Sequence, residues 1–189
     1  MSASKIIDAA VIRFAKQGYE DASLAQIAED AGIRKPSIYA HFSSKKQLFL
    51  KILEAAFLKE MDHVAALASE GSLEALKKYI FEIESRFQQD IYLLFWLRAL
   101  YLPPNEIKAE IHAYDAQFVE ALDNAIDISI GYLWQNKIGD FVDAKVFGAA
   151  YAGIIRGVHG ELLYHGASEA RQMASAMWAV FSLALNQCQ

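Results

Sequence analysis

The stretch of sequence that decides the fold spans residues 18–48 and reads GYEDASLAQIAEDAGIRKPSIYAHFSSKKQL. Its apolar residues recur at spacings of three and four, a pattern that predicts amphipathic helices. Ser23 and Gln26 form a predicted capping box at the start of one helix, and Gly32 ends that helix. A short helix is predicted to follow over residues 35–42. Two helices joined by a turn of so few residues form a helix-turn-helix.

The outer face of the second of these helices carries side chains suited to DNA. Ile38 and Phe42 are apolar and lie one helical turn apart, so they point inward and the remaining side chains point outward. Cations and hydroxyls on such a face suit the phosphates and base edges of a major groove. Lys45 begins the next helix, where a phosphate would meet both backbone N–H groups and an ammonium. The predicted DNA-binding residues are Ser23, Gln26, Arg34, Lys35, Ser37, Tyr39, Ala40, His41 and Lys45.

The remainder of the 189-residue chain shows the same helical spacing, and no convincing run alternates with period two. The sequence therefore predicts an all-α fold. Pro103–Pro104 and Gly139–Asp140 are predicted breaks between helices. A helix of about 25 to 30 residues is predicted to start near Ile107. The other predicted helices span residues 4–17, 23–31, 35–42, 44–71, 72–89, 91–102, 143–165 and 168–186.

Charge is distributed unevenly along the chain. Residues 1–47 carry seven basic and five acidic side chains, hence +2, in a chain whose net charge is −5, which leaves −7 for the remainder. A local positive excess favours contact with a polyanion such as nucleic acid. Because 54% of the residues are hydrophobic, the chain also has enough apolar side chains to build a core.

Residues 18–48 resemble the N-terminal DNA-binding signature of the TetR family of regulators. The matching positions are Ser23, Ile27–Ala28, Ala31–Ile33, Ser37–Tyr39, His41–Phe42, Lys45 and Leu48. The resemblance covers about a quarter of the chain, and the remainder is similar to the family in length, helical content and helix order. It implies a homodimer that represses a nearby promoter and leaves its DNA operator, an inverted repeat, when a small-molecule effector binds.

The resemblance also implies roles for single residues. Tyr39 and His41 look like phosphate contacts, and Lys35 and Ser37 look like groove-facing readers of bases. The sequence departs from the family pattern at Ala40, where the family often has an aromatic residue. The smaller side chain lowers the contact area there, although a methyl group could still touch a thymine methyl.

The predicted division of the chain is a helix-turn-helix DNA-binding domain over residues 1–47 and a helical domain for effector binding and dimerisation over residues 48–189. The predicted helix 143–165 contains four glycines, each of which costs roughly 1 kcal/mol relative to alanine. Close approach of a partner helix in a two-fold homodimer explains them, and so does a bulky neighbour in the same subunit. We favour the dimer, because helix-turn-helix proteins bind paired half-sites. The residues predicted to form the dimer interface are Gly153, Gly157, Gly160, Met173, Met177, Val180, Phe181 and Ala184.

Aromatic residues are dense beyond the helix-turn-helix, and we predict that some of them line a mainly apolar effector pocket. The predicted walls are Phe57, Phe87, Tyr92, Phe95, Trp96, Tyr114, Phe118 and Tyr151, and the predicted polar contacts are Arg98, His112 and Arg156. The polar side chains could orient a carboxylate or a ring oxygen of the effector. The net charge of −7 on residues 48–189 instead favours a cationic effector. The sequence does not decide between these two classes of effector.

Catalytic motifs are absent from the sequence. It contains neither a glycine-rich phosphate loop nor a Gly-x-Ser-x-Gly elbow. Glu161 and His165 lie one helical turn apart, but a single pair of this kind is more often a surface hydrogen bond than a metal site. We therefore expect no enzyme activity, no cofactor and no metal. The alternative function is an all-α ligand carrier or enzyme in which the first three helices only pack.

The sequence also bears on the compartment. No apolar segment follows the N-terminus as in a secretory signal, and no apolar run reaches the roughly 20 residues of a membrane span. The single cysteine, Cys188, excludes an intrachain disulfide. We therefore expect a cytoplasmic protein.

Overall fold

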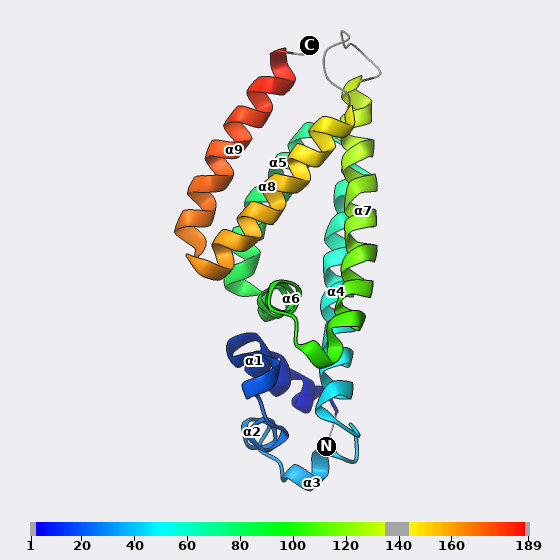
Figure 1. The fold of residues 1–189 in the computed structure, drawn as a ribbon, viewed down its shortest axis with the longest axis vertical. Helices are drawn as coiled ribbons and strands as arrows, with labels where there is room; N and C mark the ends of the chain where they lie inside the picture. Colours follow the sequence, from blue (N-terminus) through cyan, green and yellow to red (C-terminus); the bar gives the residue numbers. More distant parts are fainter. Residues whose placement is uncertain (1–2, 135–143, 188–189) are drawn as a thin grey trace. The chain divides into compact units, whose positions relative to one another are not determined.

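The computed structural model describes residues 3–134 and 144–187, so the predicted break at Gly139–Asp140 and the residue Cys188 lie outside the described residues. Within these residues the chain forms nine α-helices, one 3-10 turn and no strand, which confirms the predicted all-α fold (Figure 1). None of the described helices is both long enough and apolar enough to cross a membrane. The elements are α1 (Ala3–Asp21), α2 (Leu24–Asp30), α3 (Lys35–Ile38), α4 (Lys45–Glu70), α5 (Leu73–Gln89), α6 (Ile91–Tyr101), η1 (Asn105–Ile107), α7 (Lys108–Trp134), α8 (Ala144–Tyr164) and α9 (Ala167–Gln187).

The described residues divide into two compact units. The first unit contains the chain up to Lys59 together with Asp90–Asp115. The second unit contains Glu60–Gln89 and the described residues from Ala116 onward. The predicted division after residue 47 follows the motif in the sequence, whereas these units follow compactness in space. As a result, α6 and η1 belong to the same unit as the helix-turn-helix.

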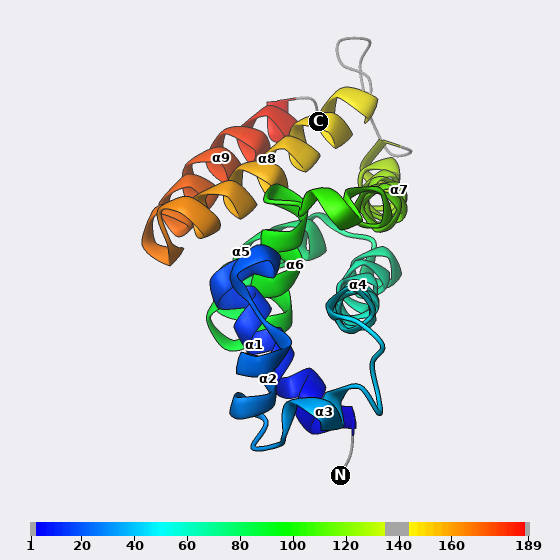
Figure 2. The same ribbon diagram turned by 60° about the horizontal axis from the view of Figure 1, so that its bottom comes forward.

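The core of the first unit is built from aromatic side chains. Helix α1 packs against α2 and α6, and α2 packs against α3, as Figures 1 and 2 show. The ring centres of Phe14 and Phe49 are 5.1 Å apart, and those of Phe49 and Phe95 are 4.8 Å apart. All three side chains are buried, and close, tilted aromatic pairs of this kind add to the stability given by their burial. Phe95, predicted to line an effector pocket, therefore lies in the core beside α1 and α4.

Helix α1 continues past the glycine that was predicted to end it. Gly18 has φ 85° and ψ 176°, outside the helical region, and a further helical turn follows to Asp21. Glycine adopts such a positive φ at little cost, so it interrupts the helix without ending it. The predicted end at Gln17 was therefore short by one turn.

The second unit is organised around a helical hairpin. Helices α8 and α9 lie side by side in Figures 1 and 2, and α5 packs against both. The turn between them contains Gly166, whose φ of 105° again favours glycine. In the core of this unit the buried Tyr151 hydroxyl donates to Leu76 O at 2.7 Å, so α8 is joined to α5 by a satisfied polar contact.

Candidate nucleic-acid interface

Helix α2 begins with a reciprocal side-chain cap. Gln26 N donates to Ser23 Oγ at 3.3 Å, and Ser23 N donates to Gln26 Oε1 at 2.9 Å. This pair is the capping box that the sequence predicts, and it satisfies two backbone donors at the start of the helix. Both side chains were also predicted to bind DNA, and that role stays a prediction.

The turn between α2 and α3 depends on Gly32. Its φ is 66°, in the left-handed region that glycine adopts most easily. Gly32 N donates to Glu29 O at 3.0 Å and Ile33 N donates to Ala28 O at 2.9 Å, which satisfies carbonyls at the end of α2. A Cβ at Gly32 would meet no atom within 4 Å. Glycine is therefore needed here for its backbone conformation and not for space.

Helix α3 is shorter than the sequence predicts, but its hydrogen bonds continue beyond it. The helix ends at Ile38, whereas the predicted helix extended to residue 42. His41 N and Phe42 N both donate to Ile38 O at 2.9 Å, so one more turn follows. Ile38 and Phe42 are buried, as predicted, and they fix the orientation of this segment.

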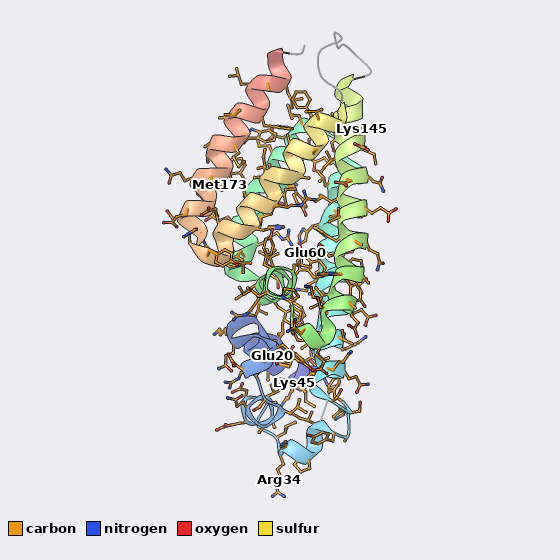
Figure 3. The ribbon with its side chains drawn as sticks, in the orientation of Figure 1. Glu20, Arg34, Lys45, Glu60, Lys145 and Met173 are labelled. Atoms are coloured by element: carbon orange, nitrogen blue, oxygen red, sulfur yellow. The ribbon has the colours of Figure 1, made fainter. Side chains whose placement is uncertain are left out.

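The opposite side of this segment faces outward. Arg34, Lys35, Tyr39, Ala40 and His41 are exposed, and Ser37 is half-buried. In Figure 3 the Arg34 side chain extends away from the protein. Within residues 3–134 and 144–187, the structure gives none of these five exposed side chains a hydrogen bond or an ion pair. Unpaired cations beside an exposed phenol and imidazole form a surface that phosphates and base edges can bind.

Two other cations of the first unit are already paired. Arg13 makes an ion pair with Asp30 at 2.6 Å, which joins α1 to α2. Lys46 makes one with Glu110 at 2.6 Å. These two side chains therefore stabilise the unit, and Arg34 and Lys35 carry positive charge that remains available to a polyanion.

Lys45 is engaged within the chain. Its Nζ donates to Tyr19 O at 2.7 Å and to Ala22 O at 3.1 Å, and it lies 4.2 Å from the centre of the Tyr19 ring. The ammonium thus satisfies carbonyls at the end of α1, where a positive charge is also favourable to the helix dipole. The spacing of residues in the sequence gives no sign of this contact. The predicted role of Lys45 as a phosphate clamp stays a prediction.

Polar contacts join α1 and α4, which flank the helix-turn-helix, to η1 and to the start of α7. The Tyr19 hydroxyl donates to Glu106 at 2.8 Å, and Lys46 pairs with Glu110. Burial, and then the hydrogen bond to Glu106, raise the pKa of the Tyr19 hydroxyl, so it stays protonated and can donate. The DNA-facing segment therefore belongs to a unit with fixed contacts beyond the motif itself.

Arg98 on α6 also lies against α1. Its guanidinium donates to Lys16 O at 3.3 Å. A Cβ at Gly18 would lie 3.3 Å from Arg98 Nε, so the interrupted turn of α1 also leaves room for this side chain. The sequence predicts that Arg98 binds the effector, and the structure places it beside α1, the helix that precedes the helix-turn-helix.

The other predicted effector residues are divided between the two units. In the first unit Phe57 lies 4.9 Å from Tyr114 and 6.0 Å from Trp96, measured between ring centres. Tyr92 is half-buried beneath the ammonium of Lys59, which lies 4.5 Å from its ring centre. In the second unit Phe118 and Tyr151 are buried and Phe87 is half-buried, whereas His112, in the first unit, and Arg156 are exposed. Their role as pocket walls stays a prediction.

Three buried titratable side chains of the second unit were not predicted to form a site. Glu60, Glu84 and His159 each have at most 9% of their surface exposed. A signal for two of them is present in the sequence. Glu60 and His159 each fall at a position of the apolar stripe of their helix, where a titratable residue is unusual.

The predicted dimer residues lie on α8 and α9, and they differ in what surrounds them. A Cβ at Gly157 would overlap Cε of Met173 in the same chain, and Figure 3 shows Met173 on α9 beside α8. A Cβ at Gly153 or Gly160 would meet nothing within 4 Å. Val180 is 70% exposed and Met177 is exposed, Met173 and Ala184 are half-buried, and Phe181 is buried. The end of the Met173 side chain thus occupies the space beside Gly157 within the subunit, and the other two glycines leave open surface.

Comparison with known proteins identifies relatives of part of the chain. Residues 6–52 match the model of the family described as bacterial regulatory proteins, tetR family. The chain is 31% identical over 88 residues to the biofilm operon icaADBC HTH-type negative transcriptional regulator IcaR of Staphylococcus epidermidis, covering 44% of this chain and 48% of IcaR. It is 35% identical over 89 residues to IcaR of Staphylococcus aureus strain Newman, with the same coverage. The chain thus spans about half the length of the curated relatives it matches.

Comparison of structures extends the likeness to nearly the whole chain. SmeT, the repressor of the Stenotrophomonas maltophilia multidrug efflux pump SmeDEF, has a TM-score of 0.72 at 15% identity, covering 97% of this chain and 90% of SmeT. AibR, solved in complex with isovaleryl coenzyme A and operator DNA, has a TM-score of 0.68 at 19% identity, covering 94% of this chain and 96% of AibR. At such identities the likeness establishes the fold.

Proposed function

The chain belongs to the tetR family of bacterial regulatory proteins, and on that premise we propose that it is a sequence-specific DNA-binding transcriptional regulator. We propose that it acts as a repressor and that a small-molecule effector releases it from its operator. The negative regulators among its relatives support the direction of control. A role on DNA implies that the protein works in the cytoplasm.

The observation that carries this proposal is the exposed face around α3. Its cations and aromatic side chains make no hydrogen bond or ion pair within the described residues, while the opposite side is anchored by the buried Ile38 and Phe42. An enzyme or carrier that used these helices only for packing would have no need of unpaired cations on a fixed outer surface. The regulatory function explains them better than the alternative does.

We propose that the protein binds DNA as a homodimer through α8 and α9. Val180 and Met177 are exposed apolar side chains on α9, and Gly153 and Gly160 leave open surface on α8. Exposed apolar surface that gathers on neighbouring helices is typical of protein–protein interfaces. A two-fold dimer then predicts an operator with inverted half-sites about one or more helical turns apart.

The test of the function is a selection of bound fragments from random DNA, followed by a salt titration of the affinity for the selected site. We expect an inverted repeat and a steep fall of affinity with salt, because bound phosphates release counterions. Lys45→Ala should weaken binding to all sequences and lower the slope of log affinity against log salt by about one. Ser37→Ala should instead change the sequence preference.

The matched control is Lys77→Ala, which removes an exposed lysine of α5 in the second unit. It should leave both the affinity and the salt slope unchanged. The proposal would be contradicted if no DNA sequence were enriched in the selection and if salt did not lower the affinity for DNA. That result would favour the alternative, in which the first three helices only pack. Full DNA affinity in a Tyr39→Ala, Lys45→Ala double variant would contradict the assignment of the surface.

A further inference from the structure

The second unit buries charged side chains next to one another. Glu60 on α4 has 3% of its surface exposed, and it makes an ion pair with Arg86 on α5. Figure 3 labels Glu60 on α4. Buried ion pairs cost desolvation and are weak evidence of a purely stabilising role. The pair therefore calls for another explanation.

The Arg86 guanidinium is not fully satisfied by this pair. One of its terminal nitrogens donates to Glu60, and its Nε is buried and has no hydrogen-bond acceptor. The other buried carboxylate of the unit differs, because Glu84 accepts from Arg171 at 2.5 Å and from Gln88 at 3.2 Å. A buried donor without an acceptor is costly, so Arg86 Nε is a position where an incoming oxygen gains a hydrogen bond.

Two further polar side chains lie close enough to this pair to sense its charge. Burial and then Arg86 lower the pKa of His159 to about 3, so its imidazole is neutral near pH 7. Burial and then Glu60 raise the pKa of Tyr79, so its hydroxyl is neutral as well. Within residues 3–134 and 144–187 the Tyr79 hydroxyl makes no hydrogen bond, which leaves it a second donor.

We propose that Arg86, supported by Glu60 and Tyr79, forms the polar end of the effector site and binds the carbonyl oxygen of an uncharged, mainly apolar molecule. This inference rests on the proposed function, in which an effector controls DNA binding. Tyr151 and Phe181, whose ring centres are 5.8 Å apart, supply buried aromatic surface in the same unit.

The class of ligand follows from the net charge of the four side chains Glu60, Arg86, Tyr79 and His159. Glu60 and Arg86 cancel, and the tyrosine and histidine beside them are neutral. A carboxylate or an ammonium bound here would add a buried charge with no partner, which is unfavourable. A carbonyl oxygen adds an acceptor without adding a charge. The choice between an anionic and a cationic effector, which the sequence leaves open, is thus replaced by a neutral one.

The test compares head groups on matched apolar bodies by calorimetry with the full chain. One series is methyl heptyl ketone, octanoate and octylamine, and the other is benzylacetone, hydrocinnamate, phenylpropylamine and propylbenzene. We expect the ketones to bind more tightly than the charged members and the hydrocarbon. Tighter binding of either charged class, or no binding by any member, overturns the inference.

The decisive variant is Arg86→Lys, which keeps a cation beside Glu60 and removes Nε. It should weaken ketone binding roughly ten- to a hundred-fold, the value of a hydrogen bond to a charged group. Arg171→Lys, which changes an exposed guanidinium of the same unit, should leave it unchanged. Equal ketone affinity of wild type and Arg86→Lys overturns the inference.

A measurement on the wild-type protein covers the case in which Arg86→Lys does not fold. With nitrogen-labelled arginine, the Nε–H resonance of Arg86 should shift when a ketone is added and not when propylbenzene is added. Absence of that shift overturns the inference, since an ordered water at Nε would then be the occupant. DNA binding is measured on the same samples. Loss of ketone binding with DNA binding intact rejects only the ligand class, whereas failure to bind DNA rejects the proposed function.

Discussion

Acid should destabilise the folded protein through His159. Burial, and then the positive charge of Arg86, lower the pKa of its imidazole from 6.5 to about 3. In the unfolded chain both causes are removed, so the imidazole takes up a proton as the pH falls below about 6.5. Between these two pKa values the unfolded state binds more protons than the folded state. The free energy of unfolding therefore falls as the pH falls through this window, and His159 adds no pH dependence above it.

The magnitude follows from the two pKa values. At pH 5 the unfolded imidazole is almost fully protonated and the folded one is almost fully neutral. The difference in proton binding, integrated from neutral pH down to pH 5, amounts to about 2 kcal/mol of the free energy of unfolding. That is a large share of the stability of an ordinary domain.

The assay is urea denaturation of wild type and His159→Gln at pH 8 and at pH 5, at one protein concentration. Carboxylates titrate in both proteins, so their effects cancel in the comparison. Wild type should lose about 2 kcal/mol more than the variant between the two pH values. His112→Gln, at an exposed histidine, should lose as much as wild type. Equal losses in wild type and His159→Gln would refute the reasoning.

Three further outcomes are expected. Gly32→Ala should lower the free energy of unfolding by about 1–2 kcal/mol through backbone strain, whereas Gly131→Ala, with a helical backbone and open space, should not lower it. Urea denaturation compares the two variants. Val180→Glu should yield monomers in sedimentation and weaken DNA binding, and a variant that stays dimeric would place the interface elsewhere. Operator DNA should weaken ketone binding by the factor by which ketone weakens DNA binding, because linkage is reciprocal; unequal factors in parallel titrations would show that the two ligands are not coupled in this way.

Much of the fold could be predicted because its determinants are local. The capping box at Ser23, the positive φ of Gly32 and the spacing of apolar residues act within a few positions of one another. The end of α1 was missed because it depends on a distant residue. The carbonyls beyond Gly18 are satisfied by Lys45, which lies 23 or more positions away. A helix end that is satisfied by tertiary contacts leaves no local pattern to find.

The same distinction explains the candidate sites. The outer face of α3 follows from helical geometry once Ile38 and Phe42 are assigned inward. The spacing of residues in the sequence does not show what lies beside Gly157. Whether Met173 of the same chain or a second subunit lies there depends on how α8 and α9 pack. The Glu60–Arg86 pair joins residues 26 positions apart on two helices. The sequence shows only that a carboxylate occupies an apolar stripe.

Helix α4 gives the proposed regulation a physical route. Lys45, at its first residue, holds the end of α1, and Glu60, fifteen residues further along the same helix, belongs to the buried pair with Arg86. Both residues therefore belong to one helix of the chain. A ligand that changes the Glu60–Arg86 contact can act on DNA binding only if its affinity differs between two positions of this helix. Lys45 binds backbone carbonyls at the end of α1, so a shift of the start of α4 would move the end of α1 with it. Helix α1 packs against α2, and a movement of α1 would therefore change the orientation of α2.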